Sequence, residues 1–138
     1  MTLPYIDTDV IIRLLTGDDP AKQAAASALF ERVEQGSLTI AAPDTVIADA
    51  VHVLASPRLY KLSRAQVAAL LTPLTRLSHF RVQNRRSVLE ALRVYGTTGG
   101  LDFGDALLVA IMQQDGSETL YSYDRHFDRI AAIQRQEP

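Results

Sequence analysis

The chain has 138 residues, of which 47% are hydrophobic and 22% charged, and its formal net charge is −2. This length suits a single domain, 1–138. A chain with this apolar fraction and low net charge is expected to fold rather than to be disordered. Because the sequence contains no cysteine, it excludes a disulfide framework, a zinc–thiolate site and a cysteine nucleophile. Any chemistry must come from oxygen or nitrogen groups or from a hard metal ion.

The start of the chain gives no sign of export. It lacks the basic segment that opens a signal peptide, and Asp7 and Asp9 interrupt its apolar run. No stretch approaches the roughly 18 apolar residues of a membrane span. We therefore expect a cytoplasmic protein that does not enter a membrane.

Asp is much more frequent than Glu in this chain, and Arg is much more frequent than Lys. Eleven of the sixteen acidic residues are Asp, and twelve of the fourteen basic residues are Arg. Because Asp is a poor helix former, its excess indicates helix caps, turns and metal sites. Arg is the usual choice for forked contacts to phosphate or carboxylate groups.

Strands that alternate with helices are predicted along the whole chain, which is typical of an α/β fold with a parallel sheet and right-handed crossovers. Ser63 and Gln66 have the spacing of a capping box, and Pro73 is expected to bend or end the helix that follows. Asp102 caps a helix whose apolar run, 106–112, indicates a buried position. The predicted strands are 3–6, 38–41, 80–82, 119–123 and 130–133, and the predicted helices are 10–16, 20–35, 43–54, 64–73, 85–95 and 103–112.

Several aspartates fall where ligands bind in such a fold. Asp7 and Asp124 follow predicted strands, and the carboxyl ends of parallel strands meet at one edge of a sheet. Asp105 lies in the first turn of the apolar helix, three residues after Asp102, so the two can share a face. Asp49 lies inside a helix, where its spacing from the apolar residues leads us to expect that it borders the core.

Crowded carboxylates repel one another and are costly to desolvate, so they need a divalent cation or arginine partners. Mg²⁺ takes a few carboxylates and leaves its other positions to water and phosphate oxygens, which suits phosphodiester hydrolysis. Each acid also has a purely structural interpretation. Asp7 and Asp102 are explained as helix caps, Asp105 as a first-turn acid favoured by the helix dipole, and Asp124 as the start of a turn.

Three segments resemble the PIN-domain ribonucleases, and in particular the single-domain toxins of VapBC toxin–antitoxin pairs. Residues 5–20, YIDTDVIIRLLTGDDP, are similar to the family's opening strand and helix. Residues 101–110, LDFGDALLVA, and 122–127, SYDRHF, are similar to its third and fourth acidic motifs. The order and spacing of these motifs agree with the family over nearly the whole chain.

The resemblance implies that Asp7, Asp105 and Asp124 form an acidic pocket and bind the metal ion. The second acidic position of the family is usually Glu but is Asp49 here. Its side chain is one methylene shorter, which implies binding through water or a lowered activity. Asp102 matches an acid that is less consistent in the family, so we place it beside the metal ligands rather than among them.

The implied fold is a three-layer sandwich in which helices flank a central, mostly parallel sheet of four to five short strands. The implied activity is endoribonucleolytic: Mg²⁺ or Mn²⁺ binds the scissile phosphate of RNA and lowers the pKa of an attacking water. The toxin resemblance also implies a homodimer and a cognate antitoxin protein, an amphipathic segment of which lies in a groove between helices.

Two other functions stay open. A strand followed by 7–9 mimics the nucleophile motif of haloacid dehalogenase-type phosphohydrolases, but that chemistry also needs a lysine, and only Lys22 and Lys61 exist. Asp49 in place of Glu leaves room for a catalytically weakened PIN-like interaction module whose acidic cleft receives arginines from a partner. Metal titration distinguishes a nuclease from such a module, because only the nuclease must bind the metal and cut RNA.

Basic and aromatic residues near the acidic motifs are candidates for RNA contacts, although a solvated surface or core packing explains them as well. The three histidines do not have a metal-ligand spacing. The arginine candidates are Arg13, Arg58, Arg81, Arg85 and Arg86, and the aromatic candidates are Tyr121, Tyr123 and Phe127.

Overall fold

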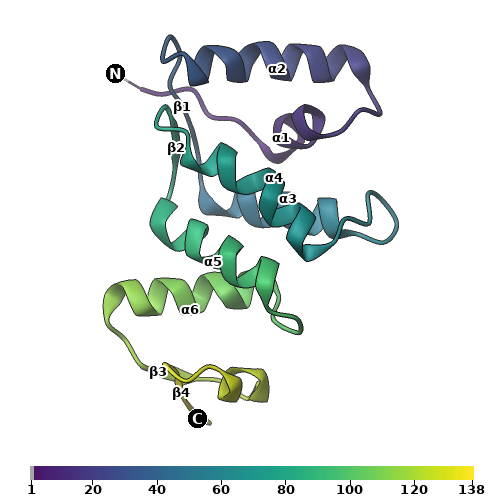
Figure 1. The fold of residues 1–138 in the computed structure, drawn as a ribbon. Coiled ribbons are helices and arrows are strands. Elements are labelled where there is room, and N and C mark those ends of the chain that lie inside the picture. The colour runs from purple at the N-terminus through teal and green to yellow at the C-terminus, as the bar shows by residue number, and fades with distance from the viewer. Residues whose placement is uncertain (1) are drawn as a thin grey trace.

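Figure 1 shows the computed structural model, which describes residues 2–138. The helices are α1 (Thr8–Leu15), α2 (Pro20–Glu34), α3 (Asp44–Ala55), α4 (Arg64–Arg76), α5 (Arg85–Thr97), α6 (Phe103–Asp115) and the short 3₁₀ helix η1 (Arg125–Arg129). The strands are β1 (Ile40–Ala42), β2 (Phe80–Val82), β3 (Thr119–Tyr121) and β4 (Gln134–Gln136). The α/β prediction and the predicted α-helices are confirmed.

The helix that carries the capping-box signal begins where the sequence predicts. Ser63 accepts a hydrogen bond from the backbone N–H of Gln66, and the Gln66 side chain accepts one from the backbone N–H of Ser63. Pro73 does not end this helix, which continues to Arg76. Pro73 is exposed while the opposite face of α4 is buried in the core, so packing stabilises the helix beyond the proline.

The strands form two separate parallel pairs. In the first pair β1 lies beside β2, with Ile40 opposite Phe80. The strand predicted at 3–6 is reduced to a single bridge between Tyr5 and Ala41 on the other side of β1. The second pair consists of β3 and β4.

The structure therefore does not form the expected central sheet of four to five strands. Figure 1 shows α6 between α5 on one side and the β3–β4 pair on the other. The apolar side of this pair packs on α6 in a cluster of its own, which consists of Val109, Met112, Phe127 and Ile133 with Leu120 and Ile130 at its edge. Because this contact already buries the apolar side chains of the pair, pairing with β1 would bury no further apolar surface.

The last predicted strand, 130–133, is displaced to β4. Ile130 ends η1, and Ile133 is buried in the small cluster rather than placed in a strand. β4 has no apolar residue, so hydrophobic alternation is unable to reveal it. Its central residue, Arg135, is held by a hydrogen bond to Asp128 at 2.8 Å and by another to the carbonyl oxygen of Ser122 at 3.0 Å.

The main core joins α1–α6 and the β1–β2 pair. Phe80 of β2 is fully buried, and Phe30 of α2 packs edge-on against it with ring centroids 5.7 Å apart. The helices α4 and α5 approach closely at Gly96, where an added Cβ atom would lie 2.8 Å from that of Ala68. The predicted burial of α6 is confirmed for most of its apolar run, whereas Leu108 is 40% exposed.

Candidate active site

The first turn of α6 carries two carboxylates. Asp102 is the N-cap of the helix, and its Oδ1 atom accepts a hydrogen bond from the backbone N–H of Asp105 at 2.8 Å. The Asp105 side chain is half-buried in this first turn. The positive end of the helix dipole favours negative charge here, so the fold offsets part of the repulsion between the two acids.

Burial raises the pKa of the Asp105 carboxyl above its ordinary value, and the negative charges of Asp102 and Asp124 raise it further. The neighbouring His126 acts in the opposite direction. These electrostatic interactions show that the structure brings Asp102, Asp105 and Asp124 near one another, although Asp124 is distant in the sequence. Asp7 and Asp49 are not among the charges that act on Asp105, so the predicted pocket of Asp7, Asp49, Asp105 and Asp124 stays a prediction.

Asp124 is the N-cap of η1 and is fixed by local hydrogen bonds. Its backbone N–H donates to Ser122 Oγ at 3.0 Å, and its Oδ1 atom accepts from the backbone N–H of His126 at 2.9 Å. The His126 ring nitrogen Nδ1 also contacts this oxygen. The hydrogen bond from the His126 backbone is the largest cause that lowers the pKa of Asp124. The environments of Asp105 and Asp124 thus shift the two pKa values in opposite directions.

Asp7 is the N-cap of α1, where its Oδ1 atom accepts a hydrogen bond from the backbone N–H of Asp9 at 2.8 Å. The next residue, Thr8, donates from its hydroxyl group to the carbonyl oxygen of Val46 at 3.4 Å. This contact fixes the start of α1 against α3 one turn before Asp49. The capping interpretation of Asp7 is confirmed, and it uses only one of the two carboxylate oxygens.

Asp49 is exposed, so the expectation that it borders the core is wrong. The buried side of α3 is formed by Val46, Ile47, Ala50, Val51 and Leu54. At 100° per residue, the direction of Asp49 lies roughly 130° from the centre of this arc. The buried face of α3 is therefore centred farther from Asp49 than the residue pattern predicts.

A hollow lies beside α3 at the N-terminus of α6. A cavity of about 410 Å³ lies between α3 and the start of α6, with Ala48 and His52 on one side and Asp102 and Gly104 on the other. Asp49 immediately follows Ala48 in α3 but does not line this cavity.

Within residues 2–138, no three His, Asp or Glu side chains are arranged so as to hold a metal ion. The donor set nevertheless fits Mg²⁺ or Mn²⁺. Mg²⁺ in proteins needs only one or two carboxylates and takes water and phosphate oxygens for the rest. Asp105 and Asp124 supply two neighbouring carboxylates, and the charge repulsion that raises the pKa of Asp105 is the kind that a cation relieves.

Arg64 of α4 positions the loop that leads into α6. Its Nη1 atom donates to the carbonyl oxygens of Tyr95, Thr98 and Leu101 at 3.3, 3.0 and 2.6 Å. Its guanidinium carbon also lies 4.4 Å from the centre of the Tyr95 ring, within cation–π range. Because Leu101 directly precedes Asp102, this one side chain sets where the acidic turn begins.

The raised pKa of Asp105 predicts that this residue destabilises the metal-free fold at neutral pH. Between the ordinary aspartate pKa and the raised value, the folded protein binds more protons than the unfolded chain, so stability falls as pH rises through this range. We expect Asp105→Asn to raise the melting temperature in EDTA at pH 7 by about 1–3 °C. Thermal unfolding followed by circular dichroism measures this difference, which should shrink at acidic pH. An unchanged or lower melting temperature at pH 7 contradicts the prediction.

Short parallel strands between helices, with aspartates at a buried helix N-terminus and after a strand, define an α/β protein with neighbouring carboxylates at the start of α6. The chain belongs to the PIN domain family, the model of which matches residues 5–133. PIN domains are nucleases, usually metal-dependent, and act on nucleic acids. A comparison with curated proteins gives no match. Among residues 2–138 there is no helix with the length and apolar content of a membrane span.

Sequence reasoning passed over two residues near the site. His126 has no metal-ligand spacing, yet it contacts Asp124 and influences Asp105. The sequence signal for this contact is the position of His126 two residues after Asp124, in a turn. Tyr5 is 70% exposed and lies two residues before Asp7. Because side chains alternate along an extended segment, Tyr5 and Asp7 are predicted to lie on the same side of the chain.

Proposed function

We propose that this protein is a metal-dependent endoribonuclease that hydrolyses RNA phosphodiester bonds. The observation that carries the proposal is the PIN domain match over residues 5–133, in a chain with Asp102 and Asp105 joined in the first turn of α6. An enzyme of this kind needs crowded carboxylates, because their mutual repulsion is relieved when a cation binds between them.

In this proposal Asp105 and Asp124 would hold Mg²⁺ or Mn²⁺ directly. Asp7 would complete the site through a bound water, because no three acids of residues 2–138 are arranged to hold a metal ion by themselves. When bound, the cation supplies positive charge to the scissile phosphate and lowers the pKa of an attacking water. Asp102 keeps the first turn of α6 in place through its hydrogen bond to the Asp105 backbone. His126 fixes the orientation of the Asp124 carboxylate. Asp49, exposed on α3, would reach the metal only through water because its side chain is short.

The proposed biological role is that of the toxin in a type II toxin–antitoxin pair, with 1–138 as a single cytoplasmic PIN domain that forms a homodimer. Its support is the resemblance of 5–20 to the opening segment of the VapC-type toxins. A cognate antitoxin would insert an arginine against the carboxylates, where charge-assisted hydrogen bonds favour it. A small antitoxin-like reading frame directly upstream of the gene is the expected genetic observation.

One observation favours a second candidate, a PIN-like module that binds a partner without cutting RNA. Asp49 stands where the family usually has Glu, and it is exposed rather than directed at the core. In such a module the carboxylates of α6 and η1 would receive arginines of the partner protein in place of a cation.

The test is cleavage of a labelled single-stranded RNA with Mg²⁺, with Mn²⁺ and with EDTA. We expect cleavage with either metal and none in EDTA, because the carboxylates alone cannot stabilise the negative charge of the transition state. A DNA strand of the same sequence is the matched control for substrate class. Metal-independent cleavage, or no cleavage together with no metal binding by calorimetry, contradicts the proposal and supports the interaction module.

A further inference from the structure

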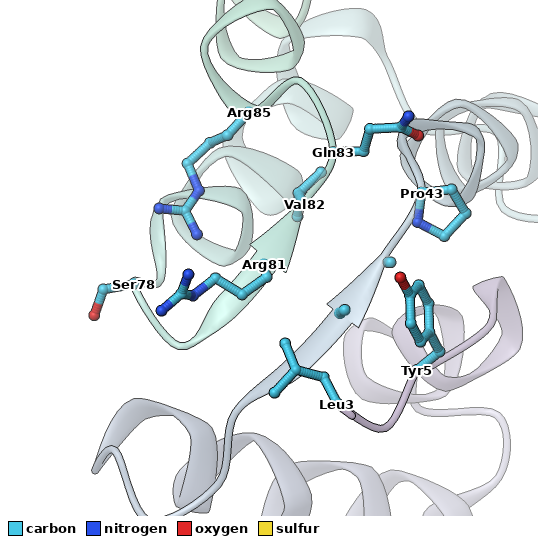
Figure 2. A pocket seen from close by; sticks show the side chains of 10 residues that line it. Leu3, Tyr5, Pro43, Ser78, Arg81, Val82, Gln83 and Arg85 are labelled. Carbon is cyan, nitrogen blue, oxygen red and sulfur yellow. The ribbon is translucent and has the colours of Figure 1, made fainter. Parts of the chain in front are cut away.

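A basic cavity of about 610 Å³ lies on the open side of the β1–β2 pair (Figure 2). Its lining contains two arginines, Arg81 and Arg85, and no Asp or Glu. The other residues are Leu3, Tyr5, Ala41, Ala42, Pro43, Ser78, Val82 and Gln83. Since the whole chain has a net charge of −2, this concentration of positive charge is local.

The two arginines are oriented by the strand and the helix that carry them. Arg81 is exposed because it alternates with the buried residues Phe80 and Val82 along β2. Arg85, in the first turn of α5, donates through Nη2 to the carbonyl oxygens of Leu77 at 3.0 Å and of Phe80. Figure 2 shows both guanidinium groups extending to the same side of the cavity.

These positive charges have no acidic partner within the described chain, residues 2–138. No carboxylate lies within ion-pair distance of Arg81 or Arg85, and the Nε atom of Arg85 is buried without a hydrogen-bond acceptor. Two like charges that line one cavity repel each other. An anion between them would remove this repulsion, and a forked guanidinium suits a phosphate group.

The cavity adjoins the proposed catalytic site through Tyr5. Tyr5 and Asp7 are two residues apart on an extended segment, so their side chains project from the same side, roughly 6–7 Å apart along the chain. Ile6, between them, is buried on the opposite side. The Tyr5 ring is 70% exposed, which leaves its face available for stacking.

We propose that this cavity binds single-stranded RNA on one side of the cleavage site, an inference that rests on the proposed function. Arg81 contacts a backbone phosphate, Arg85 adds positive charge from a fixed position, and the Tyr5 ring stacks on a base. Proteins that bind single-stranded nucleic acid usually combine arginines that contact phosphate with exposed aromatic rings that stack on unpaired bases. The segment 5–7 thus carries both the stacking group and the catalytic aspartate.

A second cavity, of about 530 Å³, also contains arginines but is less suited to bind RNA. It lies between α4, α5 and α6 and is lined by Arg76, Arg86 and Arg93. Glu90 in the same lining forms an ion pair with Arg93, so part of the positive charge is already neutralised. Arg86 therefore provides the matched control, since it is an exposed arginine close in sequence to Arg85.

Fluorescence anisotropy of a labelled single-stranded oligoribonucleotide in EDTA tests the proposal without cleavage. We expect Arg81→Ala to weaken binding about ten-fold and to lower the slope of log affinity against log salt by about 0.7. We expect Tyr5→Ala to weaken binding about ten-fold and Tyr5→Phe to retain it, because stacking needs only the ring. Arg86→Ala should bind like the wild type.

The outcomes separate this proposal from the proposed function, because binding in EDTA does not depend on the metal site. Wild-type affinity in Arg81→Ala, equal losses in Arg81→Ala and Arg86→Ala, or no binding by the wild type overturns the RNA-binding cavity. Each of these results can occur together with normal metal-dependent cleavage. Circular dichroism of each variant verifies the fold. If Arg81→Ala unfolds, it is replaced by Arg81→Gln, which keeps the aliphatic stem as far as Cδ and removes the charge.

Discussion

Asp105→Asn is expected to abolish metal-dependent RNA cleavage, with a fall in rate of at least about 100-fold. Asparagine has nearly the same shape as aspartate but no charge, so it can occupy the first turn of α6 while it no longer neutralises a cation. The backbone N–H of residue 105 can still donate to Asp102, since that hydrogen bond does not involve the side chain. The fold therefore stays intact, and the metal-free protein becomes slightly more stable.

A matched control for this variant is Asp115→Asn, which removes an exposed aspartate at the other end of the same helix. Cleavage by Asp115→Asn should equal that of the wild type. Calorimetric titration with Mn²⁺ then shows whether the loss in Asp105→Asn comes from weaker metal binding. Asp7→Asn is expected to lose cleavage in the same way. Full cleavage by either Asp105→Asn or Asp7→Asn would remove that residue from the active site.

Arg64→Ala is expected to cost about 2–4 kcal/mol of the free energy of unfolding. The substitution leaves the carbonyl oxygens of Thr98 and Leu101 without their donor and removes the cation–π contact with Tyr95. This loss is large beside the roughly 5–15 kcal/mol that stabilises a domain. Urea unfolding followed by circular dichroism measures it.

The same substitution is expected to lower cleavage even under conditions where the protein stays folded. Without Arg64, the loop before Asp102 loses its attachment to α4, and the acidic turn of α6 is less well positioned. Arg64→Lys should recover part of the stability, because one ammonium group replaces only some of the hydrogen bonds. Arg76→Ala, an exposed arginine at the end of α4, is the control. Arg64→Ala with wild-type stability and activity would contradict this role.

The candidate site was predictable to the extent that local patterns define it. Asp102 as a cap, Asp105 three residues later and Asp124 after a strand all follow from positions in the sequence, and the structure brings these three together. The exposure of Asp49 was not predictable in this way, because the centre of an apolar arc depends on which residues the neighbouring helices cover. The contact of His126 with Asp124 needed the geometry of η1.

The α/β class, the helices with their caps and the acidic motifs all follow from the residue pattern. These are local properties, since side-chain periodicity and hydrogen bonds between near neighbours decide them. Tertiary packing sets the pairing of the strands: they form two pairs instead of one sheet, and residues 134–136 form β4 although none of them is apolar. The reason is that strand pairing depends on which apolar surfaces are already buried, and α6 buries the inner side of the β3–β4 pair.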